Sequence, residues 1–229
     1  MVMKRQKIRH RRIHEEGKRS VLGLVLLLFV INVPMYLYEP HWLFAVTLIL
    51  TALLLVFVAY FFRNPIREIE ISDPNFLLAP ADGRVVVIEP VMEDEVFHEK
   101  RLQVSIFMSP LNVHANWYPV EGTIIRSEHQ KGRHMQAWLP KSSTENERSL
   151  VIIETPQKVQ VAVRQIAGAM ARRIVTYAKE GKDAHRNEHL GFIKLGSRVD
   201  MYLPLDTEIF VKVGEAVRGN ETIVGRLPE

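Results

Sequence analysis

The chain contains no cysteine among its 229 residues, and this absence excludes several kinds of chemistry. Disulfide bonds, cysteine-ligated zinc, iron–sulfur clusters and thiol nucleophiles all require a cysteine side chain. The sequence also lacks the glycine-rich phosphate-binding loop of nucleotide hydrolases and the Gly-x-Gly-x-x-Gly motif of dinucleotide-binding enzymes. An enzyme with this sequence must therefore rely on serine, histidine, carboxylate or lysine side chains, or on another cofactor.

Positive charge is concentrated at the N-terminus instead of being spread along the chain, whose formal net charge is +4. Residues 1–20 carry eight basic and two acidic side chains, a net charge of +6. Residues 21–62 contain one charged residue, Glu39, and residues 63–229 carry a net charge of −1. A nucleic-acid-binding domain gathers basic residues on its own surface. The pattern therefore disfavours nucleic acid as a partner and favours a polybasic arm beside a membrane.

Two long apolar segments follow this basic arm, Val21–Tyr38 and Trp42–Phe62. As helices they would be about 27 and about 31 Å long, close to the roughly 30 Å hydrocarbon core of a bilayer. A short polar turn, residues 39–41, separates them. We therefore expect two transmembrane helices within residues 21–62. The alternatives are a buried helical hairpin in a soluble protein and a cleavable signal peptide, which the second apolar segment disfavours.

Basic residues lie outside both ends of this hairpin, in the N-terminal arm and at Arg63 and Arg67. The positive-inside rule then predicts that the arm and residues 63–229 face the cytoplasm, with the protein in the inner (cytoplasmic) membrane. Arg63 and Arg67 are expected either to anchor this topology or to meet the anionic lipid surface.

Residues 63–229 are expected to form one mainly β domain. Short apolar runs rich in β-branched residues alternate there with turns that contain proline or glycine, as strands do. They cover residues 84–89, 103–108, 122–126, 149–154, 159–166, 198–203 and 208–213. Gly168–Ala178 has a helical pattern. The predicted fold class is mainly β (α+β), a barrel- or sandwich-like domain preceded by a transmembrane helical hairpin.

Two segments of this domain, Ala79–Val87 and Lys212–Val224, share one design of strand, glycine turn and strand. The second is similar to the hairpins of lipoyl and biotinyl domains, which present a lysine at the hairpin tip for the cofactor. Here the tip region contains Arg218, Gly219 and Asn220, so a carrier function is disfavoured. A biotinyl-like binding or adaptor domain on a membrane hairpin, without catalysis, stays open.

Three polar residues next to predicted strands supply the parts of a catalytic triad. Asp82 precedes a glycine, His114 lies between two prolines, and Ser197 follows Gly196. Each taken alone is typical of a turn or a surface. Together they offer an orienting acid, a base and a nucleophile. A membrane-anchored serine hydrolase is one interpretation, but no Gly-x-Ser-x-Gly motif surrounds Ser197.

No metal site is predicted from the histidines. His185 and His189 are four residues apart, but they lack a His-Glu-x-x-His pattern and lie in a loop rich in charged residues. That setting favours a solvated pair, with a metal site as the alternative.

The motifs around Asp82, His114 and Ser197 resemble those of the phosphatidylserine decarboxylase family, and the resemblance extends over residues 63–229. They occur in this order: Pro80-Ala81-Asp82-Gly83, Asn112-Val113-His114-Ala115-Asn116 and Gly191-Phe192-Ile193-Lys194-Leu195-Gly196-Ser197-Arg198-Val199-Asp200. Residues 143–148 and 165–175 are most similar to the short form of the family, which includes archaetidylserine decarboxylase-like members. Trp117 stands where longer members have a second histidine. Asn112 stands where the short form usually has aspartate, and it keeps the capacity to hydrogen-bond the loop backbone.

The resemblance implies a pyruvoyl-dependent proenzyme that cuts its own chain at a Gly-Ser bond, here Gly196–Ser197. The products would be chains 1–196 and 197–229, which stay associated. Ser197 would be the nucleophile and the precursor of the pyruvoyl group. His114 would be the base, and Asp82 would fix its tautomer.

The implied reaction belongs to phospholipid biosynthesis. It is the decarboxylation of phosphatidylserine to phosphatidylethanolamine at the membrane, with the pyruvoyl carbonyl accepting the electrons released as CO₂ leaves. An ether-linked archaetidylserine is the alternative substrate. The resemblance also leaves room for a homodimer.

Overall fold

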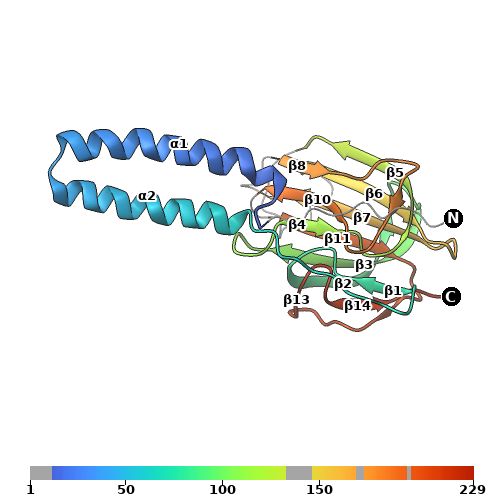
Figure 1. Ribbon diagram of the computed structural model, residues 1–229. Helices are drawn as coiled ribbons and strands as arrows, with labels where there is room; N and C mark the ends of the chain where they lie inside the picture. The colour runs from blue at the N-terminus through green and yellow to red at the C-terminus, as the bar shows by residue number, and fades with distance from the viewer. Residues whose placement is uncertain (1–11, 133–145, 169–172, 195–196) are drawn as a thin grey trace. The chain divides into compact units, whose positions relative to one another are not determined.

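The computed structural model describes residues 12–132, 146–168, 173–194 and 197–229. The chain divides into two compact units, one ending at Ile66 and the other beginning at Arg67. The first is a helical hairpin, here called the helical unit, and the second is built from antiparallel strands, here called the β unit (Figure 1).

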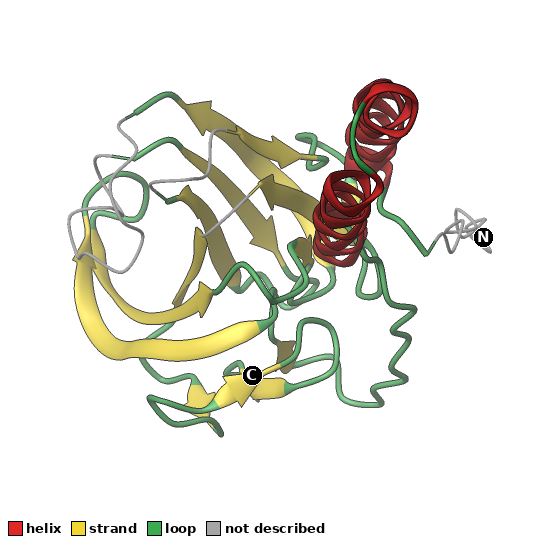
Figure 2. Ribbon diagram, turned by 90° about the vertical axis from the view of Figure 1, so that its left-hand side faces the viewer, coloured by secondary structure: helices red, strands yellow, loops and turns green. Residues whose placement is uncertain are grey.

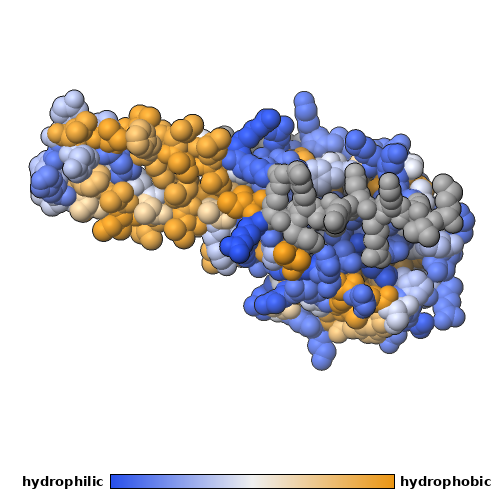
Figure 3. Space-filling view, viewed as in Figure 1, coloured by the Kyte–Doolittle hydropathy of each residue, from blue (hydrophilic) through white to orange (hydrophobic). Residues whose placement is uncertain are grey.

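The helical unit consists of α1 (Glu15–Tyr38) and α2 (His41–Phe61), which lie antiparallel (Figure 1). Helix α1 begins before the apolar segment that the sequence predicts, because the ring of His14 caps it and accepts a hydrogen bond from the Glu16 N–H at 3.3 Å. Both helices are long and apolar enough to cross a membrane. Apolar side chains cover most of their visible surface (Figure 3).

Polar contacts hold the two helices in register. At the open end of the hairpin the His14 N–H donates to the Phe62 carbonyl at 2.8 Å. Gly17 allows this approach, because a Cβ there would lie 2.3 Å from the Phe62 ring. Further along, the Asn32 side chain donates to the Thr51 hydroxyl at 3.1 Å. Interhelical hydrogen bonds of this kind stabilise helix pairs in lipid.

The β unit contains one eight-stranded and two three-stranded sheets, and every pair among the described strands is antiparallel. The strands are β1 (Phe76–Leu78), β2 (Gly83–Glu93), β3 (Glu99–Met108), β4 (Ala115–Trp117), β5 (Gly122–Gln130), β6 (Arg148–Glu154), β7 (Gln160–Ala167), β8 (Arg173–Thr176), β9 (Asp183–Ala184), β10 (His189–Lys194), β11 (Ser197–Leu203), β12 (Glu208–Ile209), β13 (Ala216–Val217) and β14 (Ile223–Arg226). The large sheet has the order β13-β2-β3-β11-β7-β6-β5-β9. Figure 2 shows it curled into a half barrel.

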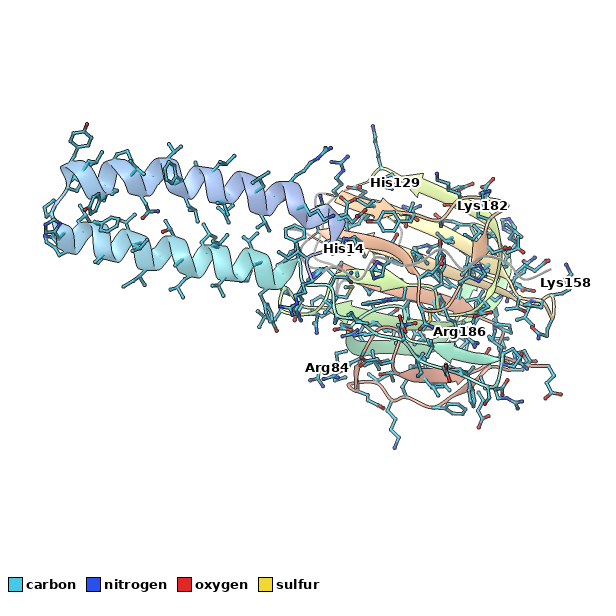
Figure 4. All side chains as sticks on the ribbon, viewed as in Figure 1. His14, Arg84, His129, Lys158, Lys182 and Arg186 are labelled. Carbon is cyan, nitrogen blue, oxygen red and sulfur yellow. The ribbon has the colours of Figure 1, made fainter. Side chains whose placement is uncertain are left out.

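The main core lies on one face of this curled sheet, and a smaller apolar cluster forms separately around Leu150, Ile152, Ala162 and Tyr202. Strand β11, between β3 and β7, directs Val199, Met201 and Leu203 into the main core, where they pack with apolar residues of the neighbouring strands. This alternation is what a period of two residues along a strand requires. Exposed charged residues such as Arg84 and Lys158 project from the edges of the β unit (Figure 4).

The structure confirms the prediction of a mainly β fold that follows a helical hairpin in the sequence, and most of the expected strands are present. The expected run 208–213 is a strand only at Glu208–Ile209. The predicted helix Gly168–Ala178 is wrong where the structure describes it, because Arg173–Thr176 is strand β8, paired with β10. The β-branched residues of β8 favour that outcome. Residues 169–172 lie outside the described part of the chain.

The two segments of similar design are neighbours. Strand β13 pairs with β2 through Ala216 and Arg84, and the Asn220 N–H donates to the Ala79 carbonyl at 2.9 Å. Asn220 has a positive φ of 57°, which asparagine tolerates better than most residues. The segment 212–224 is therefore held against the segment 79–87.

A buried carboxylate ties the β2–β3 turn to the middle of the large sheet. Glu93, at the end of β2, accepts hydrogen bonds from the Val96 and Phe97 N–H groups at 2.8 and 2.9 Å and from Arg164 of β7 at 3.0 Å. Burial by itself raises the pKa of Glu93, but the two N–H donors and the Arg164 charge outweigh it, so the pKa lies below its usual value.

This depressed pKa predicts acid sensitivity. Glu93 contributes stability above pH of about 4.5, the usual glutamate value, and the contribution is lost as pH falls through the lower pKa of the folded state. Glu93→Gln should lower the free energy of unfolding by about 1–3 kcal/mol at pH 7. It should also make the stability fall less steeply as the pH is lowered. Thermal unfolding of the full chain in detergent between pH 3 and 7 measures both effects. The matched control is Glu99→Gln, a largely exposed partner of Arg101; if its curve coincides with that of Glu93→Gln, the interpretation is wrong.

Candidate active site

The loop between β3 and β4 carries His114, and Asn112 gives this loop its shape. The Asn112 side-chain oxygen accepts hydrogen bonds from the Ser109 N–H at 2.9 Å and from the Ser109 hydroxyl at 2.8 Å. The Asn112 N–H in turn donates to the Ser109 carbonyl at 3.0 Å. The Asn112 side chain thus hydrogen-bonds the loop backbone, as expected of an asparagine at a position where the short form of the family usually has aspartate.

The His114 ring is fully buried and has a defined tautomer. Its Nδ1 lies 2.9 Å from the Asn112 carbonyl oxygen. Because a carbonyl can only accept, Nδ1 carries the proton, and Nε2 is the basic nitrogen of the neutral ring. This is the tautomer that a general base acting through Nε2 needs.

Ser197 is the first residue of β11 and is fully buried. It pairs with Met108 on β3 and with Ala167 on β7. Its hydroxyl donates to the Met108 sulfur at 3.2 Å, and a thioether is a weak acceptor. Gly196, the other half of the expected cleavage site, lies outside the described residues.

The His114 loop is tied to the chain on both sides of the Gly196–Ser197 bond. Before the bond, the Ile193 N–H of β10 donates to the His114 carbonyl at 3.2 Å. After the bond, Ser197 pairs with Met108, the residue from which the loop starts. The Met108 sulfur contacts both Ser197 and Asn116, two residues after His114, so the buried His114 loop and the buried start of β11 border one region.

Asp82 is held by an arginine and a main-chain N–H group. Its carboxylate accepts hydrogen bonds from the Gly219 N–H at 2.9 Å and from two nitrogens of Arg67, one of them at 2.9 Å. Among the described residues its hydrogen bonds go to Arg67 and Gly219, and the role of Asp82 in fixing the His114 tautomer stays a prediction. A buried carboxylate requires a counter-charge, which Arg67 supplies, and the Asn112 carbonyl contacts the imidazole directly.

Of the two roles expected for Arg67, its burial disfavours contact with the lipid surface, and its role as a topology anchor stays a prediction. Its side chain is 7% exposed. Besides Asp82, it donates to the Gly219 carbonyl at 2.8 Å, and its guanidinium lies 5.1 Å from the centre of the Trp117 ring. Trp117 in turn contacts His189 edge to face. Counting charges beside an apolar segment could not distinguish this internal arginine from a surface one.

A chain of buried amides, which the sequence analysis did not single out, lies beside Ser197. The Ser149 hydroxyl bonds to the Gln165 oxygen at 2.6 Å, and the Gln165 nitrogen bonds to the Asn116 oxygen at 2.7 Å. The Asn116 nitrogen lies 3.6 Å from the Met108 sulfur that also accepts the Ser197 hydroxyl. The residues come from β6, β7 and β4, so only the folded sheets bring them together.

Comparison with known proteins gives one consistent result. The family model for phosphatidylserine decarboxylase matches residues 54–225. A phosphatidylserine decarboxylase proenzyme of Bacteroides fragilis is 53% identical over 226 residues, covering 97% of this chain and 98% of the relative. Proenzymes of the same name from Bacteroides thetaiotaomicron and Cytophaga hutchinsonii are 52% and 46% identical, with 97% and 93% of this chain covered and 98% and 97% of each relative.

These matches define the class of the protein, which is an enzyme and a decarboxylase. The chain belongs to the phosphatidylserine decarboxylase family. The family resemblance inferred from the motifs around Asp82, His114 and Ser197 is thereby confirmed.

The Arg67–Asp82 pair predicts a strong dependence of stability on both charges. Removing one partner of a buried ion pair costs about 3–5 kcal/mol, whereas replacing both can be nearly neutral. Arg67→Met should therefore lower the unfolding midpoint markedly, and Arg67→Met with Asp82→Asn should recover part of the loss. Thermal unfolding of the two single variants and the double variant measures the coupling. Arg84→Met, at an exposed arginine, is the control; additive losses from Arg67 and Asp82 would contradict the coupling.

Proposed function

We propose that the chain is a membrane-anchored phosphatidylserine decarboxylase, made as a proenzyme that cuts itself between Gly196 and Ser197. The observation that carries this proposal is the His114 loop, whose buried, tautomer-fixed imidazole is tied to the chain on both sides of that bond. The names of the relatives, which are phosphatidylserine decarboxylase proenzymes, support both the substrate and the self-processing. They also favour phosphatidylserine over an ether-linked serine lipid.

Self-cleavage begins at the Ser197 hydroxyl. His114 Nε2 takes the hydroxyl proton, the Ser197 oxygen bonds to the Gly196 carbonyl carbon, and the peptide C–N bond breaks to give an ester. Elimination then removes the Ser197 Cα proton and breaks the bond between Cβ and the ester oxygen, which releases Gly196 as a carboxylate and leaves a Cα–Cβ double bond. The resulting enamine tautomerises to an imine, and one water hydrolyses the imine to ammonia and a pyruvoyl group at residue 197. Asp82 is proposed to support this site by holding the turn that leads into β2, through its hydrogen bonds to Arg67 and Gly219.

The surroundings of Ser197 fit such a group. The residue is fully buried, and the side chain that its hydroxyl contacts is a thioether, which does not react with a ketone. A pyruvoyl group, once formed, supplies a sink for the electron pair released as CO₂ leaves the substrate. In this proposal His114 returns a proton from Nε2 to the substrate carbon that loses CO₂.

The two products of the cut are proposed to stay together as one enzyme. The chain 197–229 contains β11, which pairs with β3 along seven residue positions, from Ser197–Met108 to Leu203–Leu102. It also contains β14, which pairs with β1. Separating the products would therefore expose the centre of the large sheet and its apolar core.

The site predicts that cleavage depends on one hydroxyl. Denaturing mass spectrometry of the purified wild-type chain should show two species, 1–196 and 197–229, the smaller with a blocked N-terminus that reacts with hydrazide reagents for ketones. Ser197→Ala should give one uncut, folded chain. Ser105→Ala, which alters another fully buried serine, should still be cut. Cleavage of the Ser197→Ala chain at the same bond would refute the nucleophile, and an intact, active wild-type chain would refute the proenzyme.

The helical unit predicts an integral cytoplasmic-membrane protein with the β unit in the cytoplasm. The chain should remain in the membrane pellet after an alkaline carbonate wash, because two spanning helices are not removed by raised pH. Protease should digest the β unit in inside-out vesicles and spare it in intact spheroplasts. Release by carbonate would contradict the anchor, and digestion in spheroplasts would contradict the orientation.

A further inference from the structure

The chain of amides described above has one direction. A thioether cannot donate a hydrogen bond, so the Asn116 atom that faces the Met108 sulfur must be the nitrogen. The Asn116 oxygen then accepts from the Gln165 nitrogen, and the Gln165 oxygen accepts from the Ser149 hydroxyl. Three successive donors thus point from Ser149 toward Ser197, and the last N–H belongs to Asn116.

The surrounding structure preserves this arrangement. Asn116, Gln165 and Ser149 are all fully buried, so water does not compete for their hydrogen bonds. Gly191 lies opposite Asn116 in the β4–β10 pair, and a Cβ there would lie 2.8 Å from the Gln165 nitrogen. The missing side chain of Gly191 therefore provides the space that the Gln165 amide occupies.

The Asn116 N–H and the attacking Ser197 hydroxyl contact the same atom. It shares the Met108 sulfur with the Ser197 hydroxyl, so the Asn116 nitrogen and the Ser197 oxygen are no more than 6.8 Å apart, the sum of the 3.6 and 3.2 Å contacts. When the Ser197 oxygen attacks, negative charge develops on the Gly196 carbonyl oxygen, one carbon atom away from the new bond. The thioether is a weak partner for a buried amide, and exchanging it for an anionic oxygen costs little and gains a stronger hydrogen bond.

We propose that Asn116 is the hydrogen-bond donor that stabilises the oxyanion formed during self-cleavage, and that Gln165 and Ser149 are positioning residues that aim it. The inference rests on the proposed cut at Gly196–Ser197 and assigns further residues to that reaction. Donors held in place before the reaction stabilise developing charge without having to reorganise, and removing one commonly costs about 10²–10³-fold in rate.

The test is the half-time of self-cleavage of newly synthesised full-length chain, made by cell-free translation into lipid nanodiscs and followed by denaturing mass spectrometry. Asn116→Ala should slow the cut about 100-fold or more. Gln165→Met, which keeps the volume but frees the Asn116 amide to rotate, should slow it to a smaller extent. Ser105→Ala is the matched control, since this buried serine bonds to Gln103 on β3 and not to the amide chain, and it should be cut at the wild-type rate.

A pH profile separates donation from packing. In Asn116→Asp the carboxylic acid can donate while it is protonated, and the carboxylate cannot. The two chains share the His114 base, so the ratio of the Asn116→Asp rate to the wild-type rate should rise as pH falls from 8 to 5 and the introduced carboxyl becomes protonated. Asparagine and aspartate have nearly the same shape, so a packing role alone would leave the two profiles parallel.

The outcomes distinguish this inference from the proposed function. If the wild-type chain is never cut between residues 196 and 197, both are overturned. If it is cut and Asn116→Ala is cut equally fast, or Asn116→Asp follows the wild-type pH profile, the donor role is overturned while the proenzyme stands. The unfolding midpoint of each variant is measured in the same nanodiscs. An Asn116→Asp rate that lies far below the wild-type rate at pH 8 and approaches it at pH 5, with an unchanged midpoint, supports the donor.

Discussion

The placement of β11 between β3 and β7 is the constraint on which the rest of the β unit depends. Main-chain pairing on both sides fixes Ser197 at the start of the strand, opposite Met108 and Ala167. The same pairing sends Val199, Met201 and Leu203 into the core. A shift of one residue would exchange the two faces of the strand, taking these three side chains out of the core and the Ser197 hydroxyl away from the Met108 sulfur. Burial of the core and placement of the serine are thus a single requirement.

The site combines residues whose positions are set by different sheets. His114 is positioned by the loop between β3 and β4, Ser197 by the large sheet, and Asn116 by the pairing of β4 with β10. The polar atoms in this region have neighbouring protein groups as partners: a carbonyl orients His114, and an arginine neutralises Asp82. In a dry interior each such hydrogen bond is stronger, and each unpaired group more costly, than at the surface.

The sequence predicted the helical hairpin, the mainly β class, most strands and the family, because each leaves a local pattern: apolar length, alternation, or residues adjacent in one motif. What it missed is non-local. Ile174 and its neighbours were expected in a helix, and their pairing with β10 makes them a strand. Arg67 looked like a surface charge until Asp82, fifteen residues away, proved to be its partner. The link from Gln165 to Asn116 spans 49 residues, and no spacing rule anticipates it.

The position of the proposed cut has a consequence for how the protein can fold. Before the cut, β11 reaches its place between β3 and β7 as part of one polymer, and folding is a first-order process. After it, the central strand of the large sheet belongs to a separate short chain. Re-forming the sheet from denatured material would then require two molecules to meet, at a rate that depends on concentration, and the lost translational and rotational freedom of two chains would replace the cost of closing one loop. The mature protein would therefore be stable once assembled, but it would refold slowly after denaturation.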